Sequence, residues 1–264
     1  MSAMIRTVAA VLGLLALLAA PSAHAEQKVT ITKAGFSPNL LGEPTNAFGS
    51  ATIESTTGPV PLPITHVSVF GPAGVTLDLK GTVTCTEEAL VQRGAEGCPA
   101  ASRAGFGGGR GIYQLGKELV EEDYTVDFFL SNKTPGHIEM LVFLFGHTPV
   151  IVEKVFPAKV IKGKPPYGLG FSIEVPLIKV LPEASFASAK TAFITLGAHN
   201  VVYYKKVHGK RRAFHVKGII LPHHCPAGGW PVKSEFTFED GSVVPATRTI
   251  ACPKKSGHAS RRKR

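Results

Sequence analysis

The stretch from Thr84 to Gly111 constrains the fold of this chain more than any other. Two cysteines, Cys85 and Cys98, lie 13 positions apart and bracket a short charged segment. A glycine run, Gly105-Phe-Gly-Gly-Gly-Arg-Gly111, follows soon after, between segments with the composition of β-strands. A disulfide across a loop of this length contributes roughly 3 kcal/mol by restricting the unfolded chain. The stretch therefore predicts a structural unit, a stapled loop that leads into a strand, and shows no signature of catalytic chemistry.

The segment between these two cysteines has the features of a short helix. Thr86 can cap its N-terminus, Glu87 and Glu88 lie in the first turn, where the helix dipole favours acidic residues, and Gly94 can end it. We therefore expect one short helix inside a disulfide loop.

Glycine runs also occur in phosphate-binding loops, but the context of this one is different. Phosphate-binding motifs place their glycines between a strand and the N-terminus of a helix. Here Ile112-Tyr113 follows the glycines, and the run lacks the Gly-Lys-Ser/Thr ending of a phosphate loop. The favoured interpretation is a glycine-rich strand or bulge in which neighbouring backbones pack closely.

The rest of the chain alternates short strand-like segments with turns rich in glycine and proline. Val29–Thr32 alternates apolar and polar residues, Met140–Phe145 is apolar on both faces, and Asp240-Gly241 is a strong hairpin turn. This pattern predicts an all-β fold over residues 26–253, a mainly antiparallel β-sandwich of Greek-key or jelly-roll type. A division into two β subdomains near residues 160–190 is the alternative.

The first 25 residues have the pattern of an export signal. Arg6 supplies the positive charge, Val8–Ala20 the apolar core, and Ala23-His24-Ala25 a small-x-small cleavage site. The apolar core is shorter than the roughly 20 residues that a membrane-spanning helix needs, although an uncleaved anchor is the alternative. We therefore expect a mature chain that begins at Glu26, has no transmembrane helix, and is secreted, extracellular or held in the cell envelope.

Export would place the four cysteines in an oxidising compartment, which favours two disulfides over a metal site. Four cysteines allow three pairings. The nearest-neighbour pairing, Cys85–Cys98 and Cys225–Cys252, is favoured because each pair brackets its own local unit.

The net charge of +10 is concentrated at the C-terminus. Arg6 and six cations of the last 11 residues account for seven of the ten excess charges. Residues 254–264 otherwise contain Ser, Gly, His and Ala, a composition typical of a disordered tail.

Several landmarks occur in an order that resembles a group of secreted proteins of unknown function from soil actinobacteria. They are Pro72-x-Gly74, Thr84-Cys85, Cys98-Pro99-x-x-Ser102, the glycine-rich strand, Pro222-x-x-Cys225, Trp230, Phe236-x-Phe238-x-Asp240-Gly241 and Cys252. The resemblance spans roughly residues 35–253 and rests on structural positions. It implies an exported two-disulfide β-sandwich, and it implies no activity, ligand or catalytic residue.

Tests for common enzyme signatures assign no catalytic residue. The sequence has no Gly-x-Ser-x-Gly elbow, and its one Ser-x-x-Lys, Ser260–Lys263, lies in the tail. A glycosidase would need two carboxylates about 5 to 9 Å apart in a cleft. The candidates are Glu121, Glu122 and Asp123, expected in an exposed loop, Asp127, expected on the polar face of a strand, and Glu174 and Glu183.

Histidines cluster between positions 199 and 224, and they are the best argument for a metal. The weak candidate ligands are His215, His223 and His224. Adjacent residues of a strand point to opposite faces, so His223 and His224 cannot both bind one ion there. Surface and turn histidines are the favoured interpretation, and we expect no cofactor.

Basic residues gather around a predicted hairpin, Val201–Val207 and Ala213–Leu221, that turns at His208-Gly209. Its cations are Lys205, Lys206, Lys210, Arg211, Arg212 and Lys217, and they are interleaved with Tyr203, Tyr204 and Phe214. Such a surface can bind polyanions, while a solvated hairpin whose charges prevent edge pairing explains the same residues. An exported protein is expected to meet an anionic envelope polymer or glycan and not nucleic acid.

Together these features predict an exported, non-catalytic binding or structural protein that is extracellular or associated with the envelope. The alternative is a secreted carbohydrate-active or other hydrolase with a cleft of spatially assembled residues. An accessory module that presents a peptide or glycan to a partner is a third possibility.

Overall fold

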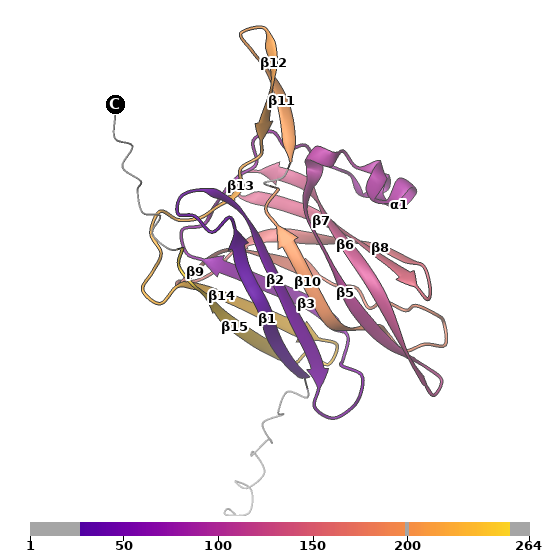
Figure 1. Cartoon of the computed structure of the whole chain (residues 1–264). Helices are drawn as coiled ribbons and strands as arrows, with labels where there is room; N and C mark the ends of the chain where they lie inside the picture. The colour runs from indigo at the N-terminus through magenta and orange to yellow at the C-terminus, as the bar shows by residue number, and fades with distance from the viewer. Residues whose placement is uncertain (1–26, 199–200, 254–264) are drawn as a thin grey trace, which may run out of the picture.

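The computed structural model describes residues 27–198 and 201–253, and Figure 1 shows their arrangement. The predicted signal, residues 1–25, and the predicted basic tail, residues 254–264, lie outside the described residues.

Nearly all regular structure in the described chain is antiparallel β-strand. The strands are β1 (Gln27–Ser37), β2 (Pro44–Ser55), β3 (Ile64–Pro72), β4 (Thr76–Asp78), β5 (Arg103–Leu115), β6 (Glu118–Thr134), β7 (His137–Thr148), β8 (Val152–Lys162), β9 (Tyr167–Glu174), β10 (Ser188–Leu196), β11 (Val202–Val207), β12 (Lys210–His215), β13 (Gly218–Ile220), β14 (Trp230–Phe238) and β15 (Val243–Ile250). The helical segments are α1 (Glu87–Arg93) and the 3-10 turns η1 (Gly94–Gly97) and η2 (Ala100–Ser102). The prediction of an all-β antiparallel fold with one short helix in a disulfide loop is confirmed.

Thirteen of the strands form one continuous sheet. Its order is β15-β14-β3-β9-β8-β7-β6-β5-β10-β2-β13-β4, and β1 pairs with β2 beside this path. Strands β5 to β9 are a meander of consecutive hairpins. Residues 160–190, the region of the alternative subdomain break, contain β9, which pairs with β8 on one side and β3 on the other, and the connection from β9 to β10.

The sheet curls until its ends approach each other, and Figure 1 shows β1 and β15 side by side. The Arg248 guanidinium of β15 donates hydrogen bonds of 2.7 Å to the carbonyls of Ile31 and Thr32 in β1. The two layers expected of a sandwich are therefore opposite walls of a single curled sheet, and the inward faces of its strands enclose the core.

Three apolar clusters fill parts of this interior. The largest joins strands β6 to β9 and includes Phe128, Met140 and Phe156. A second packs Ile53 of β2 against Phe236 and Phe238 of β14, and the third surrounds the fully buried Trp230.

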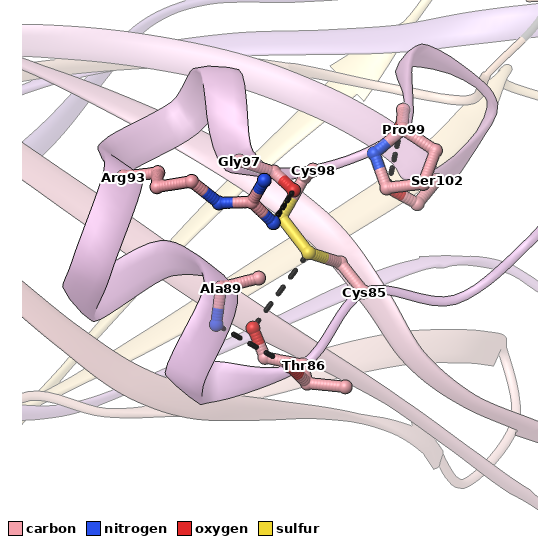
Figure 2. The surroundings of a disulfide bond; sticks show 8 residues. All are labelled: Cys85, Thr86, Ala89, Arg93, Gly97, Cys98, Pro99 and Ser102. Atoms are coloured by element: carbon pink, nitrogen blue, oxygen red, sulfur yellow. Dashed lines mark hydrogen bonds between the residues drawn. A yellow bond between two sulfur atoms is a disulfide. The ribbon is translucent and has the colours of Figure 1, made fainter.

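The helix covers part of the outer face of the sheet. Thr86 caps α1 as predicted, because its hydroxyl accepts a hydrogen bond from the Ala89 N–H at 3.3 Å (Figure 2). Leu90 is completely buried and belongs to a cluster with Phe129 of β6 and with Leu141 and Phe143 of β7. The Met140–Phe145 run is thus apolar on both faces because one face lines the interior and the other lies under the helix.

Both predicted disulfides are present. Cys85 pairs with Cys98 across the helical segment, as Figure 2 shows, and Cys225 pairs with Cys252 across the β14–β15 hairpin, with Cα–Cα distances of 5.4 and 5.8 Å. Two such bonds indicate an oxidising, extracytoplasmic location. In residues 27–198 and 201–253, no helix is both long enough and apolar enough to span a membrane.

Candidate functional site

Strands β11 and β12 form a separate two-stranded sheet that projects beyond the main sheet, at the top of Figure 1. The predicted turn at His208-Gly209 is confirmed, and both residues have positive φ, 50° and 77°. The second arm differs from the prediction, because it spans Lys210–His215 and stops there. Gly218, with a φ of 62°, redirects the chain so that β13 pairs with β2 and β4 instead.

The hairpin brings the predicted basic residues together in an unfavourable arrangement. Its register places Lys205 opposite Arg212 and Lys206 opposite Arg211. Like charges directly opposite each other destabilise an antiparallel pair. Among the described residues, the ion pairs involve none of these four cations, nor Lys210. These five cations therefore have no carboxylate within ion-pair distance among the described residues, whereas Lys217, predicted with them, lies beyond β12 and pairs with Asp78 at 3.9 Å.

Aromatic rings lie among these cations. The Tyr203 and Phe214 rings are stacked with centroids 5.7 Å apart, and the Arg211 guanidinium carbon lies 4.1 Å from the centroid of the Tyr204 ring. Tyr204 is 56% exposed, so its ring and the adjacent cations are open to a partner. The residues predicted to bind a polyanion thus share one exposed structural unit.

The base of the hairpin is anchored to the main sheet. The Tyr203 ring lies against Gly81, where a Cβ would overlap it, and Val216 is fully buried. The Val216 N–H donates a hydrogen bond of 2.9 Å to the Val201 carbonyl. A small pocket of about 390 Å³ lies beside this base. Its lining residues are Asp78, Lys80, Tyr203, Lys205, Phe214, His215 and Lys217.

The candidate metal ligands do not converge. His215 lies at the base of the hairpin, His223 packs against Gly42, and His224 is exposed in the connection to β14. His199 lies outside the described residues. Within the part of the chain that the structure describes, no three His, Cys, Asp or Glu side chains are grouped so that they could hold an ion.

The expectation that Glu121, Glu122 and Asp123 lie in an exposed loop is wrong, because all three belong to β6. Strand alternation turns Glu121 and Asp123 outward, where Arg110 pairs with them at 3.5 and 3.0 Å. It turns Glu122 inward. These carboxylates therefore do not form a pair that faces one cleft.

The other carboxylates are also separate. Asp127 pairs with Arg103, as expected of a polar strand face, and Glu174 lies 3.7 Å from His66. Glu183 is exposed in the connection between β9 and β10.

The curled sheet surrounds a second feature, an interior cavity of about 390 Å³, which has the same volume as the pocket beside the hairpin but a far more apolar lining. Its walls are mainly apolar and come from most strands of the sheet, with Val126, Leu144, Phe171 and Ile194 among the lining residues. The connection between β9 and β10 adds Pro176, Ile178 and Val180, so part of the wall is a loop. The volume falls in the range of about 300–1,000 Å³ that is typical of ligand sites.

The glycine run helps to shape this interior. The register of β5 places Gly107 and Gly109 beside Val126 and Tyr124 of β6, both of which line the cavity. A Cβ on Gly107 would lie 3.0 Å from Val126 Cγ2, and one on Gly109 would lie 2.7 Å from the Tyr124 hydroxyl. The predicted close-packed glycine strand is confirmed, because the atoms nearest to these added Cβ positions are backbone carbonyl oxygens of β10, those of Phe193 and Thr191. The glycines therefore let the two backbones approach closely, and they also leave space for side chains of β6.

One ionisable side chain stands out in the cavity wall. Glu122 is only 6% exposed, and neither carboxylate oxygen has a hydrogen-bond partner. Gly146 makes room for it, since a Cβ there would overlap the carboxylate. Burial raises the pKa of Glu122, and the nearby charge of His147 opposes that rise.

Further polar residues line the same cavity, among them Ser188, Tyr113 and Tyr124. Ser188 is 2% exposed, and its hydroxyl lacks a hydrogen-bond partner. Tyr113 is almost fully buried, and burial together with the charge of Glu122 raises the pKa of its phenol. Tyr124 also lines the cavity, and burial raises its pKa as well, although its hydroxyl donates a hydrogen bond of 3.0 Å to the Thr191 carbonyl.

The sequence analysis named Glu122 as a candidate carboxylate but placed it in an exposed loop, although the sequence contains a signal for its inward position. The residues in phase with it along β6 are Val120, Tyr124, Val126 and Phe128, all apolar or aromatic. A carboxylate in phase with such a series is expected to face the interior.

Comparison with known proteins identifies no relative: the chain matches no family model, no curated protein and no solved structure. The resemblance to secreted actinobacterial proteins stays a prediction.

Proposed function

We propose that this chain is an exported, non-catalytic binding protein whose basic hairpin, β11–β12, binds an anionic polymer or glycan of the cell envelope. The observation that supports this proposal is the pairing of cation against cation across the hairpin without carboxylate partners among the described residues.

Opposed like charges cost stability in the free protein. A polymer with repeated negative charges would relieve that cost on binding, so the arrangement favours a polyanionic partner. The exposed Tyr204 offers an aromatic ring beside the charges, which suits a sugar ring, while the Tyr203–Phe214 pair packs against the base of the hairpin.

Location supports the same class of partner. The two disulfides fit a compartment outside the cytoplasm, and the predicted export signal would deliver the chain there. The predicted tail, residues 254–264, would add six more cations to any encounter with an anionic surface.

The test is a titration of the mature chain with purified poly(glycerol phosphate) teichoic acid, with neutral dextran as the negative control. One variant replaces Lys205, Lys206, Lys210, Arg211 and Arg212 by glutamine. A matched variant replaces five exposed lysines elsewhere, at positions 117, 154, 159, 162 and 164, so that both variants have the same net charge.

We expect the hairpin variant to lose most of its affinity and the matched variant to keep most of it. Binding to the wild-type chain should weaken steeply toward about 1 M salt, where the screening length falls to about 3 Å. Equal losses in the two variants would show that net charge alone is responsible and would overturn the proposal. A strong preference for phosphatidylglycerol vesicles over the polymer would assign the hairpin to a membrane surface instead.

A further inference from the structure

We propose that the interior cavity of the curled sheet binds a small amphiphile, with the apolar body of the ligand in the cavity and a hydrogen-bond-donating head, an amine or alcohol, at Glu122. This site is separate from the basic hairpin and does not depend on the proposed function.

The apolar body of such a ligand would meet side chains from several neighbouring strands of the sheet. Val126 and Leu144 come from neighbouring strands β6 and β7, and Ile194 comes from β10 on the other side of β5. Each of these packs against the main core cluster while also lining the cavity. Apolar surface that leaves water on binding supplies the affinity, at roughly 25 cal/mol per Å².

The head of the ligand is specified by the polar part of the wall. Glu122 offers two buried carboxylate oxygens without partners, and Ser188 offers a buried hydroxyl without a partner. The two lie on either side of β5, because β6 carries Glu122 and β10 carries Ser188. A buried polar group without a hydrogen bond is costly, so a ligand that donates to Glu122 removes that cost.

The charge of the whole chain argues in the opposite direction, and this makes the proposal easy to test. With a net charge of +10, the protein should attract anionic amphiphiles by long-range electrostatics. A preference for an amine or alcohol over a carboxylate must therefore come from a local group. Among the polar groups named in the cavity wall, Glu122 is the acidic one.

The neighbouring carboxylate provides a matched control. Glu121 points outward and forms ion pairs with Arg110 and Lys190, whereas Glu122 points inward. A Glu121→Gln change therefore removes one acidic charge next to the site without changing the cavity wall.

The experiment is calorimetric titration of the mature chain with decylamine, decanol and decanoate, each below its aggregation threshold and at high salt to suppress surface attraction. The chain is tested as wild type, Glu122→Gln, Glu121→Gln and the cavity-filling variant Val126→Phe. Circular dichroism and melting curves check that each variant is folded, and Leu144→Trp replaces Val126→Phe if that variant does not fold.

We expect decylamine and decanol to bind and decanoate to bind at least tenfold more weakly. A hydrogen bond to a charged group contributes about 1.5–3 kcal/mol, so Glu122→Gln should weaken decylamine roughly tenfold or more, and Glu121→Gln should leave it unchanged. The cavity-filling variant should lose all three ligands.

Three results would overturn the proposal. Absence of binding for both decylamine and decanol would show that the cavity does not take amphiphiles. Binding that survives in the folded cavity-filling variant would place the ligand elsewhere. Equal affinity for decanoate, or equal effects of Glu121→Gln and Glu122→Gln, would remove Glu122 from recognition.

Discussion

Two short units lie outside the curled sheet, the disulfide-bracketed helix at residues 85–98 and the basic hairpin at residues 202–215, and they are built in opposite ways. The helix presents Leu90 to Phe129, Leu141 and Phe143 and is closed by a covalent bond. Most residues of the hairpin are exposed, and its like charges face each other. Stability explains the residues of the helix but not those of the hairpin, which is why we propose a binding role for the hairpin and none for the helix.

The largest loss of folding stability is expected from a substitution at Leu90 in the helix. Leu90→Ala should cost about 2–5 kcal/mol, because it opens a cavity between the helix and the outer face of the sheet. Val91, on the same helix but 63% exposed, is the matched control, and Val91→Ala should change stability by less than about 0.5 kcal/mol. Urea denaturation measures both. Similar costs for the two changes would mean that the helix does not pack as described.

A somewhat smaller loss is expected from the disulfide. Replacing both Cys85 and Cys98 by serine should cost about 3 kcal/mol, because the unfolded chain regains the freedom of the closed loop. Non-reducing peptide mapping of the wild type should recover Cys85–Cys98 and Cys225–Cys252 and no crossed pair. A double variant as stable as the wild type would show that the Cys85–Cys98 disulfide does not stabilise the helical unit.

Glu121 and Glu122 show the same contrast between an exposed and a buried position in two adjacent residues. Hydrogen bonding to Lys190 lowers the pKa of Glu121, whereas burial raises that of Glu122. A carboxyl whose pKa is higher in the folded chain than in the unfolded chain binds its proton more tightly in the folded state. The stability that this adds is fully present below the unfolded pKa of about 4.3, and it is lost as the pH rises through the folded pKa. Without ligand, Glu122→Gln should therefore melt higher than the wild type near neutral pH.

The advantage of Glu122→Gln should narrow as the pH falls through the raised folded pKa, and it should vanish below the unfolded pKa of about 4.3, where the wild-type carboxyl becomes protonated in both states. The gain should stay below the loss in Leu90→Ala. Melting curves from acid to neutral pH test this, with Glu121→Gln as the control that should lose its ion pairs and gain nothing. A Glu122→Gln difference that does not change with pH would show that the carboxyl is not ionising in a buried site.

The smallest effect on stability is expected from the hairpin. Replacing Lys205, Lys206, Lys210, Arg211 and Arg212 by glutamine should leave the melting temperature unchanged or slightly raised. The change removes two opposed like-charge pairs, each worth about 0.2–1 kcal/mol, and it removes no described ion pair. A pronounced loss of stability would mean that these residues hold the hairpin in place, and the contrast with the helix would fail.

Local patterns in the sequence predicted the local units correctly. The helix cap at Thr86 and the turn at His208-Gly209 depend on residues next to each other in the chain, and each disulfide closes its own loop, of 13 and 27 positions. Caps, backbone freedom and loop closure are therefore visible in a single sequence. The glycine run shows in the composition of the chain, although the strand β10 that packs against it is distant in sequence.

The tertiary structure decided how those units are joined and which side chains face the interior. The joining of both walls into one sheet, its closure through Arg248 and Ile31, and the cavity that results depend on pairs of strands far apart in the chain. The inward position of Glu122 depends on the extent and phase of β6, and a one-residue change of phase would have exposed it. Strand register is fixed by the hydrogen bonds and packing of neighbouring strands. The sequence therefore determined the local units, namely the strands, turns, helix and disulfides, and the assembled sheet determined which side chains of those units share the interior.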